Sequence, residues 1–359
     1  MSRPAGGALE DAARFWRVVA ALSRATAADT AIGLAPKRIV ARREGVVLAR
    51  CEGPPPDPSA APLLVVHGLV GGGAIVDLGP DRSLLAGLVA GGAPVWTLDW
   101  GPPRPGLRWL AFEDLVLDHL AEAVEVVTRA HGARPVLLGV CEGGLFALCL
   151  AALAPRSVAG LALAVTPVDC HAEPDAALTR LVRAFAPAEI EALLRRLRGL
   201  PGGALAAAFA GLTPSRTLGR HTLGLLESDG DPAAIAHYLR MERWLAERPD
   251  HPEEAARQLL VEIYHENRLF RGAFRLDGRT VDLASLAAPT LGILGLRDHI
   301  VPPACARALG PLIGPLWREC ALDAGHVGVF VSRRARGAAA AAIGGFLRDQ
   351  AVRAASRVW

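Results

Sequence analysis

The chain contains 359 residues, of which 52% are hydrophobic and 21% charged, so it can bury a large core and is not intrinsically disordered. Its formal net charge of +3 is too small to indicate nucleic-acid binding. The most apolar stretch starts at Leu145 and ends at Ala154, and the first residues do not resemble a signal peptide, so we expect no integral membrane association. Six cysteines without a CxxC pair favour a reducing cytoplasm over a disulfide framework.

The N-terminal part of the chain predicts a helix followed by a pair of strands. Apolar side chains at helical spacing predict an amphipathic helix over 9–25. A strand-like pair follows at 38–41 and 45–49, and 51–62 is a proline-rich loop. We therefore treat 1–61 as an N-terminal helix and an arm that leads into the main sheet.

After this arm the chain alternates short apolar runs with amphipathic helices. Such alternation is typical of a mostly parallel sheet covered by helices on both faces. The apolar runs cover 63–66, 94–98, 136–140, 161–165 and 290–294.

The alternation is interrupted between residues 168 and 279, where helix-forming stretches replace the apolar runs. The predicted helices there cover 176–198, 235–248 and 252–267. We predict an α/β core with an inserted helical cap and a closing helix. The core comprises 62–167 and 280–359, the cap 168–279 and the closing helix 337–359.

The strongest chemical signal is a glycine-rich turn between a predicted strand and a predicted helix. The turn reads Gly139-Val140-Cys141-Glu142-Gly143-Gly144. This is the G-x-nucleophile-x-G elbow of the α/β-hydrolase fold, with cysteine where serine is usual. A side chain at Gly139 or Gly143 would collide with the adjoining strand and helix, and a helix N-terminus favours the Cys141 thiolate. A buried structural cysteine beside a glycine-rich turn is the alternative interpretation.

A nucleophile elbow requires an acid and then a histidine further along the chain. Asp298 lies just past the predicted strand 290–294, and His326 lies in a loop 28 residues later. We predict that His326 is the base and that Asp298 is its partner. Other histidines fall in predicted helices or charged loops, where we expect them to be solvated: those at 119, 131, 221, 237, 251 and 265.

Two backbone amides are predicted to stabilise a developing oxyanion. One belongs to Glu142, directly after the nucleophile, and the other to Val70 in the loop HGLVGGG at 67–73. This loop lacks the spacing of phosphate-binding motifs, and no His, Cys and carboxylate cluster has metal-ligand spacing. We therefore expect neither a cofactor nor a metal.

At these motifs the chain resembles the poly(3-hydroxyalkanoate) synthases, most closely their short catalytic subunits that work with a second, non-catalytic subunit. The resemblance covers about 62–336, and the stretches that carry it are LDWG (98–101), GVCEGG (139–144), TPVD (166–169), DHIVPP (298–303) and GHVGVFVS (325–332). It implies that Cys141, Asp298 and His326 are the catalytic residues.

The chain departs from the family pattern at two places beside the nucleophile. Glu142 stands where the family commonly has glutamine. The family loop carries asparagine, a basic residue and then tyrosine, whereas this chain has Gly71, Gly72 and Ala74 in the loop that contains Gly71-Gly72-Gly73. These departures bear on the oxyanion geometry and the substrate preference.

The resemblance implies polymerisation of (R)-3-hydroxyacyl-CoA into a polyester, with CoA released through an acyl-Cys141 intermediate. It also implies a homodimer or a complex with a non-catalytic synthase subunit, located in the cytoplasm at the surface of polyhydroxyalkanoate granules. Two alternatives stay open. One is a cysteine-dependent esterase or thioesterase of the same fold, to which the His67-Gly68 pair points, and the other is a catalytically silent granule-associated homologue.

Apolar cap residues bear on the choice between polymerase and hydrolase, because the two differ in whether water reaches the acyl-enzyme. Seven such residues either face the substrate or only pack the cap on the core: Leu181, Val182, Phe185, Leu193, Leu194, Leu205 and Phe209.

Overall fold

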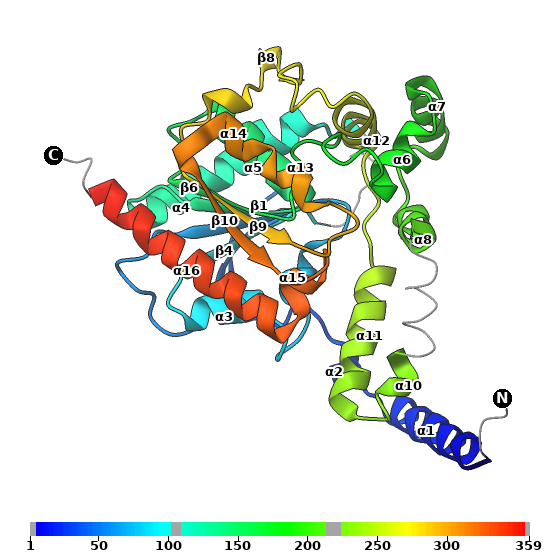
Figure 1. Ribbon diagram of the computed structural model, residues 1–359. Coiled ribbons are helices and arrows are strands. Elements are labelled where there is room, and N and C mark those ends of the chain that lie inside the picture. Colours follow the sequence, from blue (N-terminus) through cyan, green and yellow to red (C-terminus); the bar gives the residue numbers. More distant parts are fainter. Residues whose placement is uncertain (1–4, 102–108, 213–223, 356–359) are drawn as a thin grey trace.

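The computed structural model describes residues 5–101, 109–212 and 224–355 and is built around one large sheet (Figure 1). The sheet has eight strands in the order β1-β2-β4-β3-β5-β6-β9-β10. Only β1 with β2 and β2 with β4 pair antiparallel, and the other neighbours are parallel. The strands are β1 (Lys37–Arg43), β2 (Val46–Cys51), β3 (Leu63–His67), β4 (Val95–Asp99), β5 (Val136–Val140), β6 (Gly160–Ala164), β9 (Thr290–Gly295) and β10 (Trp317–Leu322).

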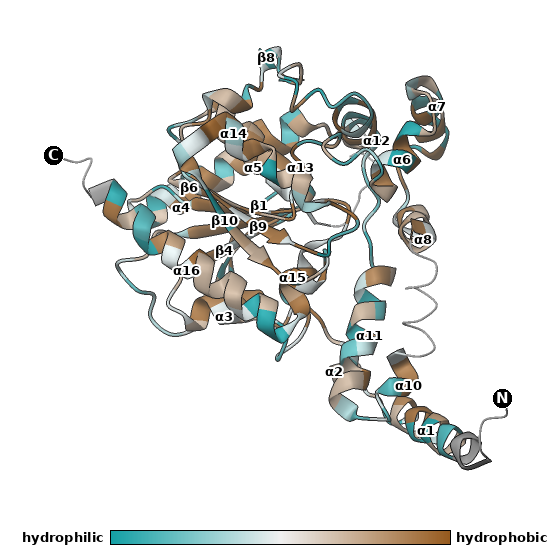
Figure 2. Ribbon diagram, in the orientation of Figure 1, coloured by the Kyte–Doolittle hydropathy of each residue, from teal (hydrophilic) through white to brown (hydrophobic). Residues whose placement is uncertain are grey.

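Helices cover both faces of this sheet, so the predicted fold class is confirmed. One hydrophobic cluster joins the sheet to η3, α4, α5 and α14, and a second joins its other face to α3, α15 and α16. The centre of the sheet is largely brown in Figure 2, which marks hydrophobic residues, and β3, β5, β6 and β9 are buried along their whole length. The elements around the sheet are η1 (Gly73–Val76), α3 (Leu84–Ala90), η3 (Asp114–Leu120), α4 (Ala121–His131), α5 (Glu142–Leu153), η6 (Leu283–Ser285), α13 (Pro303–Arg307), α14 (Leu309–Ile313), η7 (Gly314–Leu316), α15 (Gly328–Val331) and α16 (Arg333–Ala355).

The chain between β6 and β9 forms the helices expected for a cap, followed by a small hairpin. The elements are α6 (Ala177–Arg183), α7 (Pro187–Leu197), α8 (Gly202–Leu212), α10 (Leu225–Glu227), α11 (Pro232–Ala246), α12 (Glu253–Arg257), η5 (Gln258–His265), β7 (Arg275–Leu276) and β8 (Arg279–Thr280). The predicted helix 176–198 is two helices, because proline is tolerated in the first turn of a helix but not in its interior. The hairpin was not predicted, since two-residue strands leave no periodic pattern.

The structure also differs from the sequence-based prediction at the two edges of the sheet. β10 was missed because Trp317–Leu322 is an edge strand with mixed burial and presents no apolar run. At the other edge, β1 and β2 lie within the segment expected to lead into the sheet, and they are themselves its first two strands. Among the described residues, no helix is both long and apolar enough to span a membrane.

The N-terminal helices pack against the far end of the cap. In Figure 1, α1 (Ala5–Ser23) and α2 (Ala27–Thr30) lie beside α10 and α11, away from the sheet. Val18 and Ala21 form a small apolar cluster with Ile235, and Arg240 donates from Nε to the carbonyl of Ala31 at 3.1 Å. The N-terminal arm thus supports α11 as well as leading into the sheet.

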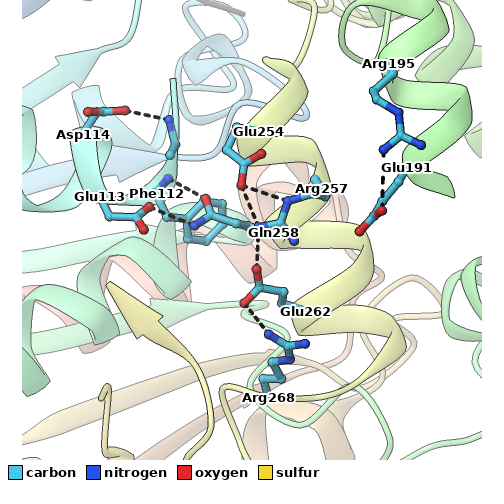
Figure 3. Close-up of polar contacts among 11 residues, drawn as sticks. Phe112, Glu113, Asp114, Glu191, Arg195, Glu254, Arg257, Gln258, Glu262 and Arg268 are labelled. Atoms are coloured by element: carbon cyan, nitrogen blue, oxygen red, sulfur yellow. Dashed lines mark hydrogen bonds and ion pairs between the residues drawn. The ribbon is translucent and has the colours of Figure 1, made fainter. Parts of the chain in front are cut away.

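The base of the cap is fixed to the core where η5 meets η3 (Figure 3). The Gln258 side chain accepts from the Phe112 amide at 2.7 Å and donates to Glu113 Oε2 at 2.8 Å. Arg257 Nη2 pairs with Glu254 Oε1 and with Glu262 Oε1, each at 2.6 Å. These contacts hold η5 in place as one wall of the site described next.

Candidate active site

Cys141 lies at the sharp turn between β5 and α5, at the carboxyl end of the sheet. Its backbone has φ 52° and ψ −117°, in the positive-φ region that costs a non-glycine residue about 1–3 kcal/mol. Two bonds hold this conformation: Cys141 N donates to the Ala164 carbonyl, and Gly144 N donates to the Cys141 carbonyl, both at 2.9 Å. The strained turn projects the thiol from the end of β5 into a cavity.

The glycines of the elbow are required by close backbone contacts. A Cβ at Gly139 would clash with Gly144, one at Gly143 with the Val66 carbonyl, and one at Gly144 with Thr166. This agrees with the steric reason derived from the sequence for Gly139 and Gly143. The elbow can form only because strand and helix approach each other without side chains between them.

We expect Gly143→Ala to destabilise the fold by about 2 kcal/mol or more, since the new methyl group meets backbone that cannot move freely. Gly345→Ala is the matched control: this helical glycine on α16 has no atom within 4 Å of an added Cβ, so the change should be neutral or slightly stabilising. Thermal unfolding of both variants measures the difference. Equal melting temperatures for the two variants would contradict the steric assignment.

The structure brings Asp298 and His326 together below the elbow. Asp298 follows β9, and its Oδ2 lies 2.7 Å from Nδ1 of His326, in the loop between β10 and α15. The other carboxylate oxygen, Oδ1, accepts the amides of Ile300 and Val301 at 2.9 Å each. Because both oxygens are bound and the side chain is fully buried, Asp298 fixes the orientation of the imidazole ring.

His326 and Cys141 line the same cavity, and the pKa of His326 depends on Cys141 as well as on Asp298. With Nδ1 facing Asp298, Nε2 is the nitrogen available to the thiol. Burial lowers the pKa of His326, but the charges of Asp298 and Cys141 and the hydrogen bonds to both outweigh it, and the pKa rises to about 10. The site therefore favours a protonated imidazole ring at His326, next to Cys141.

The other cysteines are unsuited to nucleophilic chemistry. Burial raises the pKa of Cys51 to about 11 and that of Cys305 to about 12, and it also raises the pKa values of Cys149, Cys170 and Cys320. All of them are free thiols. Since the thiolate is the nucleophile, these side chains are held in the unreactive form.

Of the two predicted oxyanion donors, the Val70 amide already has a partner, and the assignment of Glu142 stays a prediction. Glu142 is the first residue of α5, and the amides of a first helical turn have no partner within the helix. The Val70 amide donates to the Glu142 carboxylate at 3.1 Å, and the Leu69 amide donates to the same Oε2 atom at 2.6 Å. The assignment of Val70 as an oxyanion donor stays a prediction.

The expectation of solvated histidines is wrong for two of them. His119 is 6% exposed and His251 only 1% exposed. His251 lies within hydrogen-bond distance of Glu142, with Nε2 at 2.7 Å from Oε1. Sequence reasoning missed it because the partners are 109 residues apart, and the one available signal was a glutamate directly after the nucleophile. His221 lies outside the described residues.

A cavity of about 310 Å³ opens in front of Cys141 and His326. The cap residues whose role the sequence left open all line it: Leu181, Val182, Phe185, Leu193, Leu194, Leu205 and Phe209. Tyr264 and Leu259 of η5 also line this cavity. Within the described residues, no group of three or more His, Cys, Asp or Glu side chains is arranged to bind a metal ion. The wall beside the thiol is thus mainly apolar.

Comparison with known proteins agrees with this geometry. A family model described as the alpha/beta hydrolase fold matches residues 61–331. Among solved structures, the putative non-heme bromoperoxidase BpoC from Mycobacterium tuberculosis H37Rv has a TM-score of 0.51 at 21% identity, covering 80% of this chain and 92% of that one. At this identity the likeness shows the fold alone.

Similar curated sequences are more specific. A protein named poly(3-hydroxyalkanoate) polymerase subunit PhaC from Allochromatium vinosum is 35% identical over 92% of both chains. The protein of the same name from Thiocystis violacea is 33% identical, again over 92% of both chains. A third, from a Synechocystis strain, is 34% identical over 85% of this chain and 82% of its own.

Proposed function

The chain belongs to the poly(3-hydroxyalkanoate) polymerase family, and we propose that it polymerises (R)-3-hydroxyacyl-CoA into a polyester through an acyl group carried on Cys141. The observation that supports the step most directly is the chain of contacts Cys141–His326–Asp298 at the mouth of an apolar cavity. Cys141, His326 and Asp298 each have the chemistry that thioester exchange needs.

In the first half-reaction, His326 holds the proton of Cys141, and the thiolate attacks the thioester carbonyl carbon of the substrate. The tetrahedral intermediate collapses, the C–S bond to CoA breaks, and the departing thiolate takes the proton from His326. Attacking and leaving sulfurs have similar basicity, so the exchange is nearly balanced. The amides of Glu142 and Val70 would each lower the barrier by about 3 kcal/mol if they reach the oxyanion.

In the second half-reaction, a 3-hydroxyl from a second monomer or from the chain end gives its proton to His326. Its oxygen attacks the acyl carbonyl carbon, the C–S bond to Cys141 breaks, and the departing sulfur is again paired with protonated His326. Asp298 would orient His326 in both halves rather than touch the hydroxyl. Its carboxylate is engaged by His326 and two amides and is not part of the cavity wall.

The experiment that tests this function supplies 3-hydroxybutyryl-CoA, follows thiol release and sizes the product. High-mass polymer supports the synthase. Free 3-hydroxybutyrate supports the thioesterase alternative, to which the His67-Gly68 pair points, and no thiol release supports a silent homologue.

The apolar cap side chains are proposed to keep water from the acyl-enzyme. Leu193 of α7 lines the cavity and is 52% exposed, so a polar replacement there should not unfold the cap. We expect Leu193→Gln to raise the fraction of acyl groups released as free 3-hydroxybutyrate severalfold while CoA release changes by less than about threefold. Leu197→Gln on the same helix is the matched control, since Leu197 is 41% exposed and is not part of the cavity wall. An unchanged product ratio in Leu193→Gln would remove the water-excluding role.

We also propose that the chain works as a homodimer or with a non-catalytic synthase subunit, in the cytoplasm at the surface of polyester granules. The support is that relatives covering most of this chain are named as polymerase subunits. Light scattering of the purified chain, alone and with a co-purified partner, tests the assembly. Fractionation of polyester-containing cells tests the location.

A further inference from the structure

Beside the nucleophile, one carboxylate joins the cap to the loop predicted to supply an oxyanion donor. The Glu142 side chain is 2% exposed. Its Oε2 accepts the amides of Leu69 and Val70 at 2.6 and 3.1 Å, while its Oε1 lies 2.7 Å from Nε2 of His251. Hydrogen bonds to an ionised acceptor are about twice as strong as neutral ones, so this carboxylate holds its partners firmly.

His251 connects this carboxylate to the part of the cap that lines the cavity. Its backbone forms a two-way bridge with Leu200, in the turn between α7 and α8, with N–O distances of 2.8 and 2.9 Å. The Gly202 amide also donates to Oδ1 of Asp250 at 2.8 Å. The ring of His251 is therefore fixed relative to α7 and α8, whose side chains form one wall of the cavity.

The carboxylate also lies directly against the loop at 67–73. A Cβ built on Gly68 would come within 2.6 Å of Glu142 Cβ and 2.7 Å of its Oε2, so only glycine allows this approach. Glu142 follows Cys141 in the chain, and the two share the elbow. Contacts thus run without a break from the α7–α8 turn, through His251 and Glu142, to the amides of Leu69 and Val70.

We propose that Glu142 and His251 are positioning residues. They hold the loop at 67–73 beside Cys141 only when the cap packs on the core. This inference rests on the proposed polymerase function. The short bond from Leu69 anchors the loop. When the substrate binds, the Val70 amide gives up its longer bond to Glu142 and donates instead to the acyl oxygen. The hydrogen bond from His251 draws negative charge toward Oε1, away from the place where the oxyanion forms.

The test measures kcat and KM for CoA release from 3-hydroxybutyryl-CoA, together with amide hydrogen exchange of a peptide spanning 67–73. We expect His251→Ala to lower kcat about tenfold or more, to change KM less than about threefold, and to speed exchange in this peptide. His251→Gln should restore kcat to within about threefold, because the amide can still donate to Oε1. His265→Gln, at the end of η5, is the matched control and should leave both measurements unchanged.

Two variants at position 142 separate a loss of folding from a loss of the positioning role. Glu142→Ala leaves His251 buried without its partner and puts folding at risk. Glu142→Gln retains an acceptor for both amides, so it should fold and keep amide exchange at 67–73 near the rate of the parent chain. The proposal is overturned if His251→Ala leaves kcat and exchange unchanged, or if His251→Gln is as slow as His251→Ala.

A failure of this positioning inference can be distinguished from a failure of the proposed polymerase function. If the parent chain releases no CoA from 3-hydroxybutyryl-CoA, the function is wrong. Exchange at 67–73 in His251→Ala still decides the positioning role, since that measurement needs no substrate.

Discussion

Cys141→Ala should abolish CoA release from 3-hydroxybutyryl-CoA, with a loss of about 10⁴-fold or more in kcat, because no other group can carry the acyl chain. The variant should fold normally. Cys141 is half-buried beside a cavity, and removing its sulfur leaves the backbone bonds of the elbow intact. Assays of the released CoA thiol measure the loss of activity. Mass spectrometry of the parent chain after one turnover should show the acyl group on the peptide that contains Cys141.

Cys320→Ser serves as the control for this experiment. Cys320 is half-buried on β10, and burial raises the pKa of its thiol, so it is an unreactive cysteine at the edge of the same sheet. Its replacement should leave CoA release unchanged. Residual activity near the parent level in Cys141→Ala would remove Cys141 from the mechanism.

The fold could be predicted from the sequence largely because its central strands are buried on both faces. Strands of this kind appear as continuous apolar runs, and all five of the runs coincide closely with β3, β4, β5, β6 and β9. β10 could not be found in this way, since at the sheet edge its side chains are exposed or half-buried and only Leu322 is buried. Pattern recognition thus fails where burial becomes partial.

The candidate site was predictable to the extent that it is local. Cys141 is marked by glycines within three residues of it, and the order of acid and histidine in the chain pointed to Asp298 and His326. His251 was interpreted as a solvated loop residue, because nothing near it in the chain reveals the carboxylate that it meets. Contacts between cap and core depend on tertiary packing, and one sequence does not carry that information.

The expected result for Asp298→Asn separates two roles of this residue in the proposed reaction. If Asp298 orients His326, both CoA release and chain growth should fall, by about 10²–10⁴-fold as when the orienting acid of a catalytic triad is replaced. If it activates only the incoming hydroxyl, a single burst of CoA should persist while elongation stops. The bond of 2.7 Å from Asp298 Oδ2 to His326 Nδ1 favours the first outcome. Rapid-quench measurement of the burst decides between them.

The same substitution predicts a change with pH. The Asp298 charge is the chief influence opposing burial, so without it the pKa of His326 should fall from about 10 and the imidazolium should be lost at neutral pH. Alkylation of Cys141 by iodoacetamide at pH 7 should therefore slow in Asp298→Asn and recover as the pH rises.

In the parent chain, a pKa of about 10 against 6.5 in the unfolded chain stabilises the fold fully below pH 6.5, and this stabilisation is lost as the pH rises through about 10. The difference in melting temperature between the two proteins should accordingly shrink from pH 6 to pH 10, and a constant difference would show that Asp298 does not hold the charge on His326.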